Sequence, residues 1–117
     1  MEEKSILTSI KKLLGVDEDY TQFDTDIIIH INTVFMTLKQ LGVGPTQGFK
    51  IADNTAEWED FITDRIDLEG LKTYIYLKVR LVFDPPQSSY LIENIKEQIK
   101  ELEWRLNFQV ESTEGGL

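Results

Sequence analysis

The sequence contains no cysteine, a single histidine and three prolines among its 117 residues. The absence of cysteine excludes disulfides, thiolate nucleophiles and cysteine-ligated zinc sites. With one histidine, the chain also lacks the repeated Glu-x-x-His or His-Asp pairs that helical metal enzymes use. We therefore predict that the protein is not an enzyme and holds no metal or cofactor.

Long apolar runs and an excess of positive charge are missing as well. No apolar stretch approaches the roughly 20 residues that a membrane-spanning helix needs. The N-terminus opens on Glu2, Glu3 and Lys4, without the basic start and unbroken apolar run of a signal peptide. The formal net charge is −9, whereas proteins that wrap DNA or RNA need a basic surface for counterion release. We expect no membrane contact and no sequence-specific binding of nucleic acid.

What is present is the composition of an ordinary globular protein, with 41% apolar and 28% charged residues. A chain of this length buries roughly two thirds of the surface that its unfolded form exposes, so no cross-link is needed to hold a core. We predict one helical domain over residues 1–111. The polar, glycine-rich residues 112–117 are expected to form a disordered, flexible tail.

Apolar residues recur at three- and four-residue steps, which predicts an all-α fold with three to four main helices in a small bundle. The first helix is expected from Ser5 to Leu14, where Gly15 supplies the natural stop. Lys11 and Lys12 lie in its last turn, where the helix dipole favours cations.

The second helix is expected to be capped by Asp24 or Thr25 and to end at Gly42. Residues 42–56 then form one irregular region, punctuated by glycine and proline, with a strand-like alternation at 49–51. Because it can cap a helix, Thr55 is expected to begin a short helix over residues 56–62.

The third main helix is expected to begin at Asp67 and to be the central one, because its apolar residues cover more than one face. The prolines at 85–86 end it. Ser88 or Ser89 then caps a long C-terminal helix that reaches Leu106, a rod of roughly 27 Å.

Two groupings resemble fragments of metal sites, and each has a simpler structural interpretation. His30 lies four residues after Asp26 on one helical face, but two ligands do not make a metal site, so a surface or half-buried histidine is favoured. An acidic cluster could bind Ca²⁺ or Mg²⁺, but the loop before it, at 53–55, matches only the beginning of a calcium loop, which favours the solvated face of a short helix. This cluster comprises Glu57, Glu59, Asp60 and Asp64.

Two further motifs fail as catalytic or phosphate-binding sites. The Gly-Val-Gly-Pro segment at 42–45 has no Lys-Ser or Lys-Thr at the distance that a phosphate loop requires. Ser88 and Ser89 have no histidine base available, so nucleophilic catalysis has no support.

The last helix carries an apolar stripe that suits either core packing or a seam with a partner, and core packing is favoured. The stripe comprises Leu91, Ile95, Ile99, Leu102 and Leu106. Trp104 lies off the stripe, so we predict that it anchors a contact between subunits.

Other candidate assembly contacts lie outside the main helices. Phe108 and Val110 alternate with polar residues, which predicts a strand-like arm over residues 107–111 that would pair with a neighbour. Phe49 and Ile51 are candidates too, because long loops within compact domains are often functional.

Five stretches, taken in order, carry a likeness to a known family: FDTDIIIHIN at 23–32, LGVGP at 41–45, WEDF at 58–61, LKTYIYLKVRLVFDPP at 71–86 and ELEWRLN at 101–107. Together they resemble the phage head–tail connector proteins, also called head–tail adaptor or DNA-packaging connector proteins. The resemblance covers the chain from about Ile6 to Val110. Single pieces such as Asp-Pro-Pro are common, and the specificity lies in the order and spacing.

This resemblance implies a helical bundle with a long terminal helix and no catalytic site or cofactor. It also implies a ring of subunits beneath the phage portal protein, which extends the DNA channel and docks the next connector or the tail. The subunits would wait in the host cytoplasm and end at the head–tail junction of the virion. An acidic lumen would let DNA slide instead of adsorbing, which we state as a hypothesis.

A second interpretation comes from a different class of protein. A small acidic phage or bacterial regulator could bind and inhibit another protein by mimicking DNA with its negative surface. A helical hydrolase is a third interpretation, and its sequence support ends at one histidine.

Overall fold

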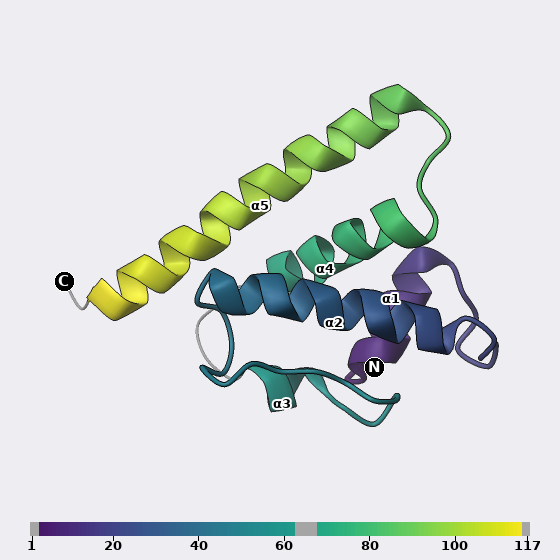
Figure 1. Cartoon of the computed structure of the whole chain (residues 1–117), viewed down its shortest axis with the longest axis horizontal. Coiled ribbons are helices and arrows are strands. Elements are labelled where there is room, and N and C mark those ends of the chain that lie inside the picture. The colour runs from purple at the N-terminus through teal and green to yellow at the C-terminus, as the bar shows by residue number, and fades with distance from the viewer. Residues whose placement is uncertain (1–2, 63–67, 116–117) are drawn as a thin grey trace.

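The computed structural model describes the backbone of residues 3–62 and 68–115, with side chains in these ranges up to Phe108. These ranges contain five helices and no β-strand, which confirms the predicted all-α fold (Figure 1). The helices are α1 (Ile6–Leu14), α2 (Asp24–Gln40), α3 (Trp58–Phe61), α4 (Leu68–Phe83) and α5 (Ser89–Gly115).

The predicted stop of α1 is confirmed by its hydrogen bonds. Gly15 has a φ of 81°, and its N–H donates to the carbonyl of Lys12 at 3.1 Å. The N–H of Val16 donates to the carbonyl of Lys11 at 2.8 Å. This pair of bonds is the Schellman arrangement, which satisfies carbonyls that the helix end leaves free. At the other end, the Ser5 side chain accepts from the Thr8 N–H at 3.2 Å.

Two of the predicted helix caps are wrong. Phe23 precedes α2 without a side-chain cap, because Asp24 is already helical and is used in an ion pair. Thr55 does not cap α3; its N–H and hydroxyl donate to Asp53, and these bonds hold the pKa of the Asp53 carboxyl below its usual value. Instead Asp60 accepts from the N–H of Glu57, the residue before α3, at 2.8 Å.

The predicted serine cap of the last helix is confirmed. Ser88 Oγ accepts from the Leu91 N–H at 3.4 Å, one turn into α5. The described part of α4 begins at Leu68, and the predicted start at Asp67 lies outside the described residues.

Helix α4 is the central element, as its apolar pattern predicts. Helices α1, α2 and α5 all pack against it. Its fully buried side chains include Leu71, Tyr74, Ile75 and Val79. Burial of side chains of this size contributes roughly 1.5–3 kcal/mol each, so α4 joins the layers of the domain into one core.

Lys11 is a buried cation that ties the turn after α1 to the core. Its side chain is 2% exposed, and its ammonium donates to the carbonyls of Glu18 at 3.0 Å and Tyr20 at 2.7 Å. The same ammonium forms an ion pair with Asp24 Oδ1 at 2.8 Å, and this buried oxygen has no hydrogen-bond partner among the described residues. Two carbonyl acceptors and one carboxylate offset the cost of burying this charge. Its position in the last turn of α1 is therefore only part of its role.

Helix α5 is longer than predicted and runs as one helix to Gly115. The strand-like arm predicted for residues 107–111 is wrong, because the helical spacing from Leu102 to Leu106 and from Trp104 to Phe108 continues through it. The backbone of 112–115 belongs to α5, and 116–117 lie outside the described residues. The division into a domain over 1–111 and a disordered tail stays a prediction.

A polar contact fixes α5 on α4. The Tyr74 hydroxyl donates to Glu103 Oε2 at 2.7 Å. The Lys78 ammonium lies 4.0 Å from the same oxygen and 5.7 Å from the centroid of the Tyr74 ring. Burial, and then the hydrogen bond and charge of Glu103, raise the pKa of Tyr74 above its ordinary value.

The raised pKa predicts an alkaline limit to this contact. The unfolded chain loses the Tyr74 proton near pH 10, whereas the folded protein keeps it. The stability contributed by Tyr74 is therefore present below about pH 10 and falls as the pH rises above it. Tyr74→Phe is expected to be less stable than the parent at neutral pH, with a difference that shrinks above about pH 10. Urea denaturation at pH values on both sides of that value measures this difference.

Tyr90→Phe is the matched control for this prediction. Tyr90 is 76% exposed, so removing its hydroxyl is expected to leave the free energy of unfolding unchanged at each pH. A Tyr74→Phe difference that is the same across the pH range would contradict the role given to the Tyr74 hydroxyl.

Candidate assembly surface

The irregular region 42–56 is fastened to α2 by one side chain. Asn32 Nδ2 donates to the Ile51 carbonyl at 3.0 Å, and Asn32 Oδ1 accepts from the Ile51 N–H at 2.8 Å. The strand predicted at 49–51 is wrong, because this amide takes both backbone bonds that a neighbouring strand would supply. Ile51 itself is 4% exposed and belongs to the core.

Three aromatic rings attach the same region to the core. The Phe35 ring of α2 lies 5.2 Å from Phe49 and 4.7 Å from Phe61 of α3, between ring centroids. Phe49 and Phe61 lie 5.3 Å apart. Phe49 is half-buried among these rings, whereas Ile51 has no surface to offer a partner. Of these two candidate contacts, Phe49 is the one with exposed atoms.

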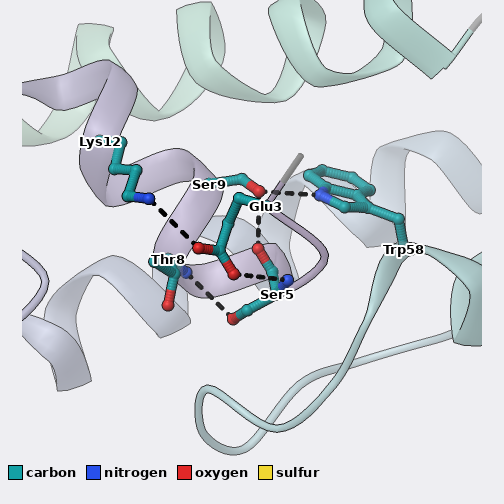
Figure 2. Close-up of polar contacts among 6 residues, drawn as sticks. All are labelled: Glu3, Ser5, Thr8, Ser9, Lys12 and Trp58. Atoms are coloured by element: carbon teal, nitrogen blue, oxygen red, sulfur yellow. Dashed lines mark hydrogen bonds and ion pairs between the residues drawn. The ribbon is translucent and has the colours of Figure 1, made fainter. Parts of the chain in front are cut away.

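The end of the region is held to the N-terminal segment, as Figure 2 shows. Trp58 Nε1 donates to Ser9 Oγ at 3.0 Å, and Ser9 Oγ donates to the Ser5 carbonyl at 2.7 Å. An antiparallel bridge joins Ser5 to Glu57. In the same view Glu3 accepts from the Ser5 N–H and from the Lys12 ammonium, each at 3.2 Å. These bonds give region 42–56 a fixed position although it has no regular structure.

Between α2 and this region lies a surface groove of about 350 Å³, which we call the Met36 groove. Met36 is 67% exposed beside it. The groove is lined by Asn32, Phe35, Met36, Lys39, Gln47, Gly48, Phe49 and Lys50. Methionine adapts its shape to many partners, so this is a surface suited to contact with an apolar side chain.

Two lysines flank the Met36 groove without a carboxylate partner in the ranges that the structure describes. They are Lys39 and Lys50, whereas most other described lysines pair with a Glu or Asp within 4.0 Å. Both are exposed. In a chain with a net charge of −9, this is a local concentration of unpaired positive charge.

The second candidate surface lies on α5. Trp104 is 67% exposed and Phe108 is 56% exposed. Their rings stack with centroids 5.6 Å apart and planes at 20°, and we call this pair the aromatic step. Helix α5 packs mainly on α4 and lies along one edge of the molecule (Figure 1). The side chain of Val110, the third predicted contact on this segment, lies outside the described ones.

The remaining outward face of α5 is charge-balanced. Its glutamates form a row at four-residue steps, and each has a cation nearby: Glu93 with Lys96, Glu97 with Lys100 and Glu101 with Arg105. Exposed pairs of this kind contribute little stability each. The apolar stripe of α5 is core in part, since Ile95, Ile99 and Leu106 are buried while Leu91 is 49% exposed.

The other sequence candidates stay apart from these surfaces. His30 is half-buried and Asp26 is exposed on α2. Within the acidic cluster Asp60 bonds to the backbone beside α3, and Asp64 lies outside the described residues. Among the residues that the structure describes, no group of three or more His, Asp and Glu is placed to hold a metal ion. None of the described helices combines the length and hydropathy needed to span a bilayer.

Sequence reasoning missed the Met36 groove. A signal was available, because Met36 lies off the apolar stripe of α2 in the way that Trp104 lies off the stripe of α5. The lysines gave no signal, since Lys39 and Lys50 come together only through the fold of region 42–56.

Comparison with protein families decides the identity. A model of the family described as "Phage connector protein" matches residues 6–113, nearly the whole chain. The chain belongs to this family. No curated protein and no solved structure matches it.

Membership in the phage connector family confirms the resemblance seen in the sequence. It supports a head–tail connector role in the phage particle and contact with other phage structural proteins. It also suggests a structural protein that is not an enzyme.

Proposed function

We propose that this connector assembles as a ring beneath the portal protein, where it extends the DNA channel and docks the tail or the next connector. The observation that carries the proposal is the family match over residues 6–113. On this proposal the subunit waits in the host cytoplasm and is incorporated at the head–tail junction of the virion.

The exposed apolar surfaces support an assembly role. Exposed aromatic side chains such as Trp104 and Phe108 are enriched among the residues that dominate binding energy in interfaces. The Met36 groove supplies a second surface on a different element. A subunit with two separate exposed apolar surfaces can contact a neighbour on each side.

The charge of the protein supports passage of DNA without adsorption. A net charge of −9 repels phosphates, and a DNA channel needs a wall to which the duplex does not bind tightly. We therefore propose that acidic side chains line the lumen of the ring. A ring with a basic lumen would contradict this part of the proposal.

Electron microscopy of the connector mixed with the portal protein from its own locus tests the function. We expect a ring of added density beneath the portal, and its rotational symmetry gives the number of subunits. The connector alone and the portal alone are the controls.

A portal that is intact by microscopy but gains no density at several salt concentrations would contradict the proposal. That result would favour the acidic regulator, whose inhibition of nucleic-acid enzymes can be titrated directly.

A further inference from the structure

We propose that the aromatic step of one subunit docks in the Met36 groove of a second copy of the same chain, head to tail. This inference rests on the proposed ring and names the contact between its subunits. Two different surfaces meet, so the contact is heterologous, and repetition of such a contact generates a closed ring or an open filament.

The first argument is that the two surfaces are separate within one subunit, because no described residue of α5 lines the groove. The aromatic step lies on α5, which packs mainly on α4. The groove lies between α2 and residues 47–50. Figure 1 shows α5 and the segment that carries residues 47–50 along opposite edges of the molecule, with α2 and α4 between them. Each surface is therefore free to receive another copy.

The second argument is complementarity of shape and polarity. The groove of about 350 Å³ has apolar atoms from Phe35, Met36 and Phe49, room for a large side chain but near the lower limit for a small-molecule site. Trp104 and Phe108 project a stacked apolar surface of the matching kind. Interface energy concentrates where such an anchor enters a pocket and excludes water.

The third argument is complementarity of charge. Lys39 and Lys50 have no carboxylate partner among the described residues. After Arg105 the sequence contains Glu111 and Glu114 and no lysine or arginine. The last turn of α5 has no basic residue, so the partial negative charge of its C-terminus is not neutralised by its own side chains. A second copy supplies that positive charge through its groove lysines.

Disulfide trapping tests the contact cleanly, because the chain has no cysteine of its own. The double variant Met36→Cys/Phe108→Cys is incubated with the portal protein and oxidised glutathione, then separated on a non-reducing gel. We expect a ladder of linked connectors that collapses to monomer on reduction. Either cysteine alone is expected to give no ladder, because a heterologous contact brings unlike positions together.

A second cysteine pair and two charge reversals serve as controls for this test. Met36→Cys/Tyr90→Cys places the second thiol at an exposed site near the other end of α5 and is expected to give no ladder. Adding Lys50→Glu to the trapping variant is expected to lower ladder yield at least about threefold, as reversal of an interface charge does. Lys4→Glu makes the same charge change at an exposed lysine away from the groove and is expected to leave the yield unchanged.

The outcomes separate this inference from the proposed function. A ring on the portal without a ladder overturns the contact and leaves the connector role standing. An equal ladder from the Tyr90 control pair also overturns the contact. Absence of both ring and ladder overturns the two proposals together, and unchanged helical circular dichroism of each variant shows that the fold is intact.

Discussion

Trp58→Ala is expected to lower the free energy of unfolding by about 3–5 kcal/mol, the range for removal of a large buried aromatic side chain. The Trp58 side chain is 3% exposed. Its Nε1 donates to Ser9 Oγ at 3.0 Å in a buried hydrogen bond (Figure 2). The Lys72 ammonium lies 5.5 Å from the centroid of the ring. Urea denaturation followed by circular dichroism measures the change.

Two controls divide this loss into its causes. Trp58→Phe keeps much of the ring but removes the donor to Ser9, so we expect a smaller loss, of about 1–2 kcal/mol. Trp104→Ala removes the other tryptophan from an exposed position and is expected to change stability by less than about 0.5 kcal/mol. Equal losses at Trp58 and Trp104 would contradict the division of the two tryptophans into core and surface.

The Trp58 result also bears on assembly. Trp58 begins α3 and, with the backbone bond from its N–H to the Lys4 carbonyl at 3.0 Å, fixes one end of region 42–56. That region supplies one wall of the Met36 groove. Adding Trp58→Phe to the Met36→Cys/Phe108→Cys variant is therefore expected to lower the yield of disulfide-linked connectors.

The helices were predictable because their evidence is local. A 3.6-residue apolar period, a capping serine and a glycine stop act within a few residues of one another. This is why α1 and its stop at Gly15, the centrality of α4 and the cap at Ser88 follow from the sequence. The family resemblance was predictable for a different reason, since it depends on the order of five stretches and not on any single one.

The features that were missed depend on contacts distant in the sequence. Asn32 binds the backbone of Ile51, 19 residues away, and a polar residue within a helix carries no sign of that partner. Lys11 is buried because a turn folds back over it, whereas its sequence position suggests only a favourable charge near a helix end. The sequence wrongly predicts an arm at 107–111 because alternation of Phe108 and Val110 over a few residues suits a strand as well as a helix.

The candidate assembly contacts are the part of the molecule that the sequence predicts least. Trp104 and Met36 share one signal, an apolar residue out of register with its own stripe, and this signal marks exposure without naming a partner. A partner can be proposed only once the fold shows which charges already have a partner within the subunit. Lys39 and Lys50 differ from most other described lysines because they lack a carboxylate partner in the described structure, and the composition does not reveal this difference.

Gly44→Ala is expected to destabilise the protein by about 2–5 kcal/mol, from two separate causes. Gly44 has a φ of 92°, and a left-handed backbone costs a residue with a side chain about 1–2 kcal/mol. A Cβ at this position would lie 2.8 Å from Cζ of Phe61 and closer still to Cε1. Forcing an extra carbon into a packed core costs about 1–3 kcal/mol. The Phe61 ring cannot move aside easily, because Phe35 and Phe49 pack on it.

Gly15→Ala isolates the backbone cause, because Gly15 has a similar φ of 81° and no atom within 4 Å of an added Cβ. We expect Gly15→Ala to lose only the conformational part, about 1–2 kcal/mol. In the Gly44→Ala background, Phe61→Leu removes the clashing ring edge, so the double variant is expected to lose less than the sum of the two single variants. Urea denaturation of the parent, Gly44→Ala, Phe61→Leu and the double variant measures this coupling. If Gly44→Ala costs no more than Gly15→Ala, the Phe61 ring does not limit the space at Gly44, and region 42–56 is free to shift relative to α3 and the Met36 groove.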